Sequence, residues 1–240
     1  MKTRPVCLMV LAFALAAPVY AGRHATPVSP ASSDDADGDA PASGQCGVER
    51  WAVKTLSDPD ASAVNVASPI DATIGELVTN PAPSPWSSGQ QVPDQRTLSG
   101  PYSETGVYAV RGVIIGYKRE ADHDFHVIIE NADPGAPPHQ TMIVEIPDPQ
   151  CPGASSSSDV SQLRAMRQWF IANIGDPATQ PTGMAHNSHP EIKRPQQMVM
   201  PNPPIPVVVT GVRFFDPLHG QDGVAPNGVE LHPVLSMQRN

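Results

Sequence analysis

Aromatic side chains, basic side chains and cysteines are all scarce in this sequence. Aromatic residues make up 5% of the 240 residues, so the chain offers little surface on which the bases of single-stranded nucleic acid could stack. Lysine and arginine number 15 against 24 aspartates and glutamates, and an acidic surface repels phosphate backbones. Nucleic acid is therefore a disfavoured partner, although the composition does not exclude a small local basic patch.

Several motifs that carry chemistry are also absent. The sequence has no phosphate-binding loop, no glycine-rich dinucleotide fingerprint and no Cys-x-x-Cys pair. The serine run 155–158 lacks the Gly-x-Ser-x-Gly context of a nucleophile elbow. No standard enzyme class is indicated, so a binding module and an enzyme both remain open.

The start of the chain points to a compartment. Lys2 and Arg4 precede a short apolar run that ends in the small-residue stretch 19–21, which is typical of a secretory signal peptide. We expect residues 1–21 to be removed and the mature protein to be periplasmic or extracellular. No later stretch is apolar and long enough to anchor it in a membrane.

Two cysteines, Cys46 and Cys151, lie outside this leader. In an oxidising compartment such a pair predicts a disulfide. It would close a loop of about 100 residues, worth roughly 4 to 5 kcal/mol, and would pin the N-terminal segment onto the main domain. Two unpaired buried thiols are the alternative.

Composition divides the mature chain into three parts. Residues 22–45 are Pro, Ala, Ser and Asp and offer almost nothing to bury, which predicts a disordered tail. Residues 46–103 are irregular, with one or two helical turns near 71–80, and should form an extension packed on the rest. Residues 104–240 carry the clear periodic patterns.

Those patterns predict five strands and one helix. The helix, at about 160–174, is indicated by Leu163, Met166, Phe170 and Ile174 on one face. Strands are indicated by runs rich in Val and Ile at 105–120, 124–131, 141–148, 207–216 and 228–237.

The order β-β-β-α-β-β is that of the OB-fold, a five-stranded Greek-key barrel. Gly112 and Gly116 suit the bend that its long first strand needs. We therefore predict a mainly β, OB-fold-like barrel with an irregular N-terminal extension. Another small barrel or a sandwich is the rival.

Acidic and imidazole side chains concentrate in the strands and in the segment 214–233. Because strand side chains alternate between faces, many of these groups should lie on the outer barrel face or its rim. The candidate site residues are Asp124, His126, Glu145, Asp216, His219, Asn227, Glu230 and His232.

Carboxylates and neutral imidazoles are ligands for divalent metals, and the predicted ligand set is Asp216, His219 and His232. The alternative is that these groups have no functional role and lie on a solvated outer face. The series His219, Asn227, His232 resembles an HNH nuclease, but a strand follows where that motif needs a helix. Turn-forming glycines and Asn-Gly suggest a hairpin instead.

Other histidine pairs are weaker candidates. His123 and His126 would point to opposite faces of a strand. His186 and His189 lie in a proline-rich loop, where a chance surface pair is the better interpretation.

The stretches RWAVKTLSD, ADHDFHVIIEN, TMIVEIPDPQC and VTGVRFFDPLHGQDGVAPNGVELHPVLSM resemble a family of bacterial secreted proteins to which no activity is assigned. The resemblance covers residues 46–240 and implies export and a single unit for the extension and barrel. A more distant likeness to the micrococcal-nuclease barrel is not supported by the spacing of Arg111 and Arg213.

Two functions follow. The first is an exported binding or accessory module that holds a small ligand, a glycan or a protein. The alternative is a metal-assisted hydrolase, a phosphodiesterase or nuclease, that uses the Asp/His/Glu cluster with a divalent metal. A purely structural role is the third reading.

Overall fold

The computed structural model of the protein describes residues 46–47, 50–81, 83, 96, 100–183 and 189–240. The expected leader 1–21 and tail 22–45 lie outside the described residues. The strands are β1 (Ile70–Ala72), β2 (Val107–Arg119), β3 (Phe125–Glu130), β4 (Thr141–Ile146), β5 (Ile205–Phe215) and β6 (Val229–Arg239). The α-helices are α1 (Trp51–Lys54), α2 (Ile74–Val78) and α3 (Val160–Asn173), and single 3-10 turns occur at Ala61–Ala63, Gly100–Tyr102, Ala154–Ser156 and Pro195–Gln197.

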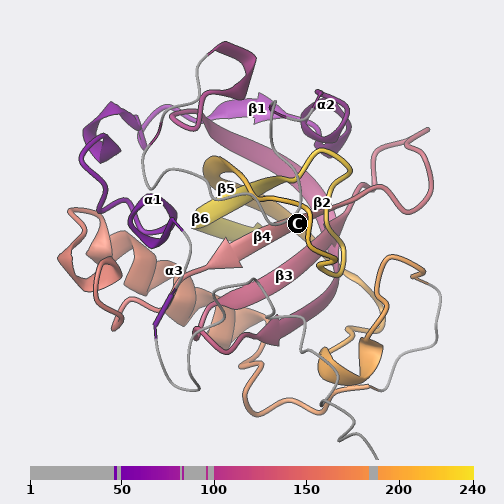
Figure 1. Cartoon of the computed structure of the whole chain (residues 1–240). Helices are drawn as coiled ribbons and strands as arrows, with labels where there is room; N and C mark the ends of the chain where they lie inside the picture. The colour runs from indigo at the N-terminus through magenta and orange to yellow at the C-terminus, as the bar shows by residue number, and fades with distance from the viewer. Residues whose placement is uncertain (1–45, 48–49, 82, 84–95, 97–99, 184–188) are drawn as a thin grey trace, which may run out of the picture. The chain divides into compact units, whose positions relative to one another are not determined.

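Five strands close into a barrel (Figure 1). The hydrogen-bonded order is β2-β3-β4-β6-β5, and β5 pairs back onto β2. β4 and β6 are parallel, and the other barrel pairs are antiparallel. With α3 inserted between β4 and β5, this is the OB topology, which confirms the predicted fold class.

The long first barrel strand serves both halves of the barrel. β2 pairs with β5 along 107–114 and with β3 along 113–119, with an irregularity between Ile114 and Gly116. A Cβ on Gly112 would lie 2.9 Å from the carbonyl oxygen of Glu130. Only glycine lets the two backbones approach this closely where the strand turns from one partner to the other.

The barrel interior is apolar, because alternate side chains along each strand point into it. Val127, Ile129 and Val144 are fully buried in the main core. From α3, Phe170 enters this core and places its ring 5.4 Å from Tyr117 and 5.7 Å from Phe125. The helix thus packs on the barrel core through the apolar face that the spacing within 163–174 predicted.

The N-terminal extension adds a strand that the sequence analysis missed. β1 pairs in parallel with β2, so Ile70 lies opposite Tyr108. Three residues, mostly exposed, are too few to display a period of two, which is why the pattern gave no signal. α2 follows, and it begins at a capping box formed by Thr73 and Glu76.

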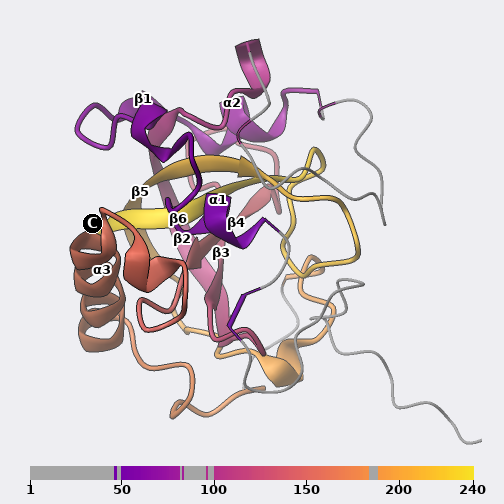
Figure 2. The ribbon, with the colours of Figure 1, turned by 60° about the vertical axis from the view of Figure 1, so that its left-hand side comes forward.

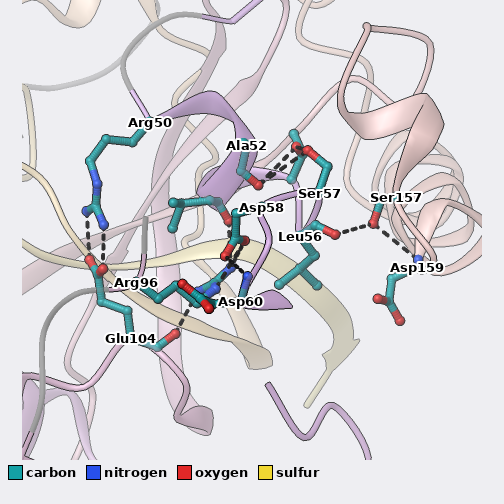
Figure 3. Close-up of polar contacts among 12 residues, drawn as sticks. Arg50, Ala52, Leu56, Ser57, Asp58, Asp60, Arg96, Glu104, Ser157 and Asp159 are labelled. Atoms are coloured by element: carbon teal, nitrogen blue, oxygen red, sulfur yellow. Dashed lines mark hydrogen bonds and ion pairs between the residues drawn. The ribbon is translucent and has the colours of Figure 1, made fainter. Parts of the chain in front are cut away.

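Buried ion pairs and the disulfide hold the extension on the barrel. Arg50 donates to the carboxylate of Glu104 at 2.8 Å, and Arg96, which pairs with Asp58 inside the extension, donates to the carbonyl of Glu104 at 2.7 Å (Figure 3). The disulfide Cys46–Cys151 is present, with a Cα–Cα distance of 5.4 Å. The predicted pairing is therefore confirmed.

The consequence is the position of α1. This helix lies beside β6 in both ribbon views (Figures 1 and 2). The hydroxyl of Ser157, just before α3, donates to the carbonyl of Leu56 at 2.9 Å, which fixes the end of the α1 segment. Lys54, the last residue of α1, is thereby held over the outer barrel face.

Candidate functional site

The site begins with two strand residues that face each other. In β3, Phe125 and Val127 point into the core, so His126 between them points outward. His126 is the register partner of Glu145 in β4. Cross-strand partners project from the same face, and His126 Nδ1 lies 3.0 Å from Glu145 Oε1.

β6 brings two more side chains to the same face. Glu230 is the register partner of Ile143 in β4, and His232 follows two residues later. His232 is 0% exposed, as is Asp124 at the start of β3. His232 Nε2 lies 3.4 Å from Asp124 Oδ2, and its Nδ1 lies 3.2 Å from Glu145 Oε2.

The segment after β5 folds back as a wall. Asp216 N donates to the carbonyl of Gly228 at 2.8 Å. Gly228 has φ +72°, and a Cβ there would lie 2.2 Å from the backbone carbonyl oxygen of Asp216. This turn therefore requires glycine. Within the wall, Asp216 Oδ2 lies 3.2 Å from His219 Nε2 and accepts from Gln221 Nε2 at 2.8 Å.

Together these elements enclose a cavity of about 30 Å³. Such a volume admits one or two water-sized groups. The residues that line it are Lys54, Lys118, Glu120, Asp122, His126, Glu145, Asp216, His219, Gln221, Asp222 and Glu230. We call this cavity the acidic pocket.

His126 is oriented by a backbone carbonyl. Its Nε2 lies 3.0 Å from the carbonyl oxygen of Asp222, and a carbonyl only accepts, so Nε2 carries the hydrogen. Its Nδ1 is thereby presented to Glu145 at 3.0 Å and to Glu120 Oε1 at 3.4 Å. Burial alone lowers the pKa of His126, but Glu120 and Glu145 raise it above its ordinary value, so without another cation the ring favours the imidazolium.

Lys54 is the central cation of the acidic pocket. It is 6% exposed, and burial alone would lower the pKa of its ammonium. The attraction of the neighbouring acidic groups, Asp216 and Glu145 foremost, outweighs burial and raises the pKa well above its ordinary value. The ammonium therefore stays charged.

The carboxyl groups of the pocket fall into two classes. Burial, together with the charges of Asp124 and Glu120, raises the pKa of Asp122 to about 8. Burial and neighbouring carboxylates likewise raise the pKa values of Asp124 and Glu230 well above their ordinary range. The value of about 8 leaves Asp122 mostly protonated near neutral pH.

Two carboxyls go the other way. Burial raises the pKa of Glu120, but Lys118 and His126 lower it more. Burial also raises the pKa of Asp216, but Lys54 and His219 lower it more, so both groups stay ionised. By contrast, burial lowers the pKa of His232 to about 4, and its ring is neutral.

Four buried polar atoms of the site have no hydrogen-bond partner. They are Asp124 Oδ2, Asp216 Oδ1 and both ring nitrogens of His232. The nitrogens of His232 lie within 3.4 Å of carboxylates, but these contacts are not aligned as hydrogen bonds. Buried polar atoms normally have partners, so the arrangement has capacity left for another group.

The structure brings seven of the eight candidate residues together. They line the acidic pocket or lie directly beneath it. Asn227 is the exception, because its amide donates to the carbonyls of Leu77 and Asn80 at 2.9 Å each. Asn227 ties the segment to the extension and is a structural residue.

The three expected metal ligands do not form one group. In the described chain, triads that could hold an ion, with ligand atoms within 4.8 Å of one another, include neither Asp216 nor His219. His232 groups instead with Asp124 and Glu145, and His126 groups with Glu120 and Glu145. A further triad cannot bind an ion, because two of its members, Cys46 and Cys151, form the disulfide beside His123.

Sequence reasoning missed several pocket residues. Glu120 and Asp122 follow β2 in the run Glu-x-Asp-x-Asp-x-His, whose alternate positions can share a face, so the spacing was a usable signal. Asp222 contributes mainly its backbone carbonyl, and Lys54 comes from far earlier in the chain. Neither carries a pattern.

Comparisons with protein-family models, curated proteins and solved structures find no match to this chain. Among the described residues, no helix is long and apolar enough to cross a membrane. The disulfide suggests an oxidising environment.

Proposed function

We propose that this protein is an exported OB-fold module that binds one divalent metal ion through Glu120, His126 and Glu145. The orientation of His126 carries the proposal. Metal-ligating histidines usually donate their second ring N–H to a carbonyl or carboxylate, and His126 does so to Asp222 while Nδ1 faces two carboxylates.

The spacing of the ligand atoms fits an ion. Metal–ligand bonds of 2.0 to 2.1 Å place neighbouring ligands about 3.0 to 3.4 Å apart. The two contacts of His126 Nδ1 are 3.0 and 3.4 Å. An ion here would replace the Nδ1 proton, and its charge would favour ionisation of the neighbouring carboxyls that burial keeps protonated.

The cavity size argues against a larger ligand inside the acidic pocket. Drug-sized ligands need roughly 300 to 1,000 Å³, at least ten times the volume of about 30 Å³ that is present. A glycan or peptide would contact only the rim. The resemblance to bacterial secreted proteins and the disulfide support export.

The test is metal binding by the purified protein with its disulfide intact. Titration with Mn²⁺ and Zn²⁺, followed by calorimetry and elemental analysis, should give one equivalent fewer for His126→Ala than for wild type. Asp71→Asn removes a carboxylate from the exposed strand β1 and should keep the wild-type stoichiometry. Equal stoichiometry in wild type and His126→Ala would refute the proposal.

A second candidate function is metal-assisted hydrolysis of phosphodiesters. It is favoured by the opposed pKa shifts of two neighbouring groups, Asp122 in the pocket at about 8 and His232 beneath it at about 4, because such pairs often mark acid–base roles. Lys54 would stabilise negative charge that develops on the substrate. Hydrolysis of bis-p-nitrophenyl phosphate that requires Mn²⁺ and disappears in Lys54→Met, under conditions where circular dichroism shows the variant folded, would support it. An inactive Mn²⁺-loaded wild type would contradict it.

A further inference from the structure

A second cluster of histidines and glutamates lies outside the acidic pocket. Glu130 ends β3, and His139 lies in the connection from β3 to β4. His189 and Glu191 come from the segment that precedes the 3-10 turn Pro195–Gln197. We call these four residues the outer cluster.

Their ligand atoms converge. His139 Nδ1 lies 3.2 Å from Glu191 Oε1 and 3.6 Å from Glu130 Oε1. His189 Nδ1 lies 3.2 Å from Glu130 Oε2. Tetrahedral zinc with bonds of 2.0 to 2.1 Å separates its ligands by about 3.3 Å, and the three distances bracket this value.

Two observations distinguish this arrangement from ordinary ion pairs. His189 Nδ1 and Glu191 Oε2 are buried atoms without a hydrogen-bond partner, so the short contact of His189 with Glu130 is not aligned as a bond. Moreover, His139 adopts φ +59°, which is uncommon outside glycine. Its backbone N–H donates to Glu130 Oε1 at 3.0 Å, which holds the strained residue beside the cluster.

We propose that the outer cluster is a second metal site, for a borderline divalent transition ion such as Zn²⁺. Two imidazoles and carboxylate oxygens form the donor set that such ions prefer. The site is independent of the acidic pocket, since the two share no ligand.

The ion would clamp a segment that also builds the acidic pocket. The carbonyl of Glu191 accepts from Gly223 N at 3.1 Å, and Lys193 N donates to Asp222 Oδ1 at 2.7 Å. Asp222 in turn supplies the carbonyl that orients His126. Zinc in the outer cluster therefore rigidifies the support of the first site.

The experiment is a zinc titration in competition with a chromophoric chelator, with Co²⁺ absorption as a spectroscopic check of imidazole coordination. The background is His126→Ala, which removes the pocket site. On this background, His139→Ala and His189→Ala should each weaken the remaining zinc site by at least about 100-fold, because each removes a direct ligand.

His123→Ala on the same background is the matched control. His123 is also a partly exposed histidine with positive φ, at +81°, but its neighbouring cysteines are in the disulfide. It should keep the zinc affinity of the His126→Ala background protein. Hydrogen exchange supplies a second readout, in which zinc should slow exchange at the amides of Lys193 and Gly223.

Three results would overturn the proposal. The first is no zinc bound on the His126→Ala background. The second is unchanged affinity in folded His139→Ala and His189→Ala proteins, and the third is an equal loss in His123→Ala. His189, unlike His139, is not one of the described residues with a positive φ. The His189→Ala variant therefore tests the site even if His139→Ala folds poorly.

Discussion

Replacement of Lys54 by methionine should strongly destabilise the protein. The side chain is buried among carboxylates that raise its pKa, and methionine matches its length without the charge. Removing one partner from a buried charge cluster costs about 3 to 5 kcal/mol. For a chain of this size that is a fall in Tm of roughly 6 to 20 °C.

The pH dependence of this effect has a definite sign. The folded pKa of Lys54 lies above its ordinary value, so the contribution of the ammonium is fully present below the unfolded pKa of about 10.4. It is lost only as the pH rises through the folded value. The part of the stability difference between wild type and Lys54→Met that comes from the ammonium should therefore be lost only above about pH 10. Near pH 8 the difference also changes with the titration of Asp122, whose ionised form Lys54 stabilises.

The assay is urea unfolding followed by circular dichroism, with a chelator present. Lys193→Met is the control, because Lys193 is exposed and should cost less than about 0.5 kcal/mol. In a second series without chelator, added Mn²⁺ should stabilise Lys54→Met more than wild type, since the variant lacks a competing cation. A Lys54→Met protein within about 1 kcal/mol of wild type would refute the buried-cluster reasoning.

Three further predictions concern other parts of the molecule. The pKa of Asp122 is raised to about 8, so the folded state holds a proton that the unfolded state releases. The free energy of unfolding of wild type should therefore fall by up to about 1.4 kcal/mol per pH unit as the pH rises from about 4 to 8. Asp122→Asn should flatten this slope in urea titrations, and an unchanged slope would contradict the prediction. The double variant Cys46→Ser/Cys151→Ser should lose about 2 to 5 kcal/mol, and an unchanged Tm in calorimetry would show that the disulfide does not stabilise the fold. Asn227→Ala leaves two carbonyls of the extension without their donor and should cost about 1 to 3 kcal/mol; its metal affinity should match wild type, and a large loss of affinity would place Asn227 in the site.

Strand and helix positions could be predicted because they depend on short-range patterns. The alternation around Val127 and Ile129 and the helical spacing of Met166 and Phe170 reflect which side chains reach the core. β1 could not be found this way, because three exposed residues show no periodicity. It forms because β2 offers it a free edge.

The candidate site was partly predictable for the same reason. Alternation places His126 and Glu145 on the outer face, and their direct pairing follows from the antiparallel register. Their partners depend on chain segments far apart. Lys54 could not be assigned to His126 without knowing how the extension crosses the barrel, and His189 had been set aside as a chance surface residue.

The sequence by itself determined the OB-fold order of elements, the Cys46–Cys151 pairing and the face on which the polar strand residues lie, because each depends on local periodicity or on residue counting. Only the tertiary structure decided that this face is covered by α1 and the segment 216–228 (Figure 2). These two segments exclude water from the cluster of acidic side chains. The resulting desolvation raises the pKa of Asp122 and lowers that of His232. Burial is a property of the assembled chain, so a solvated polar face and a metal-binding pocket have the same sequence pattern until the fold is known.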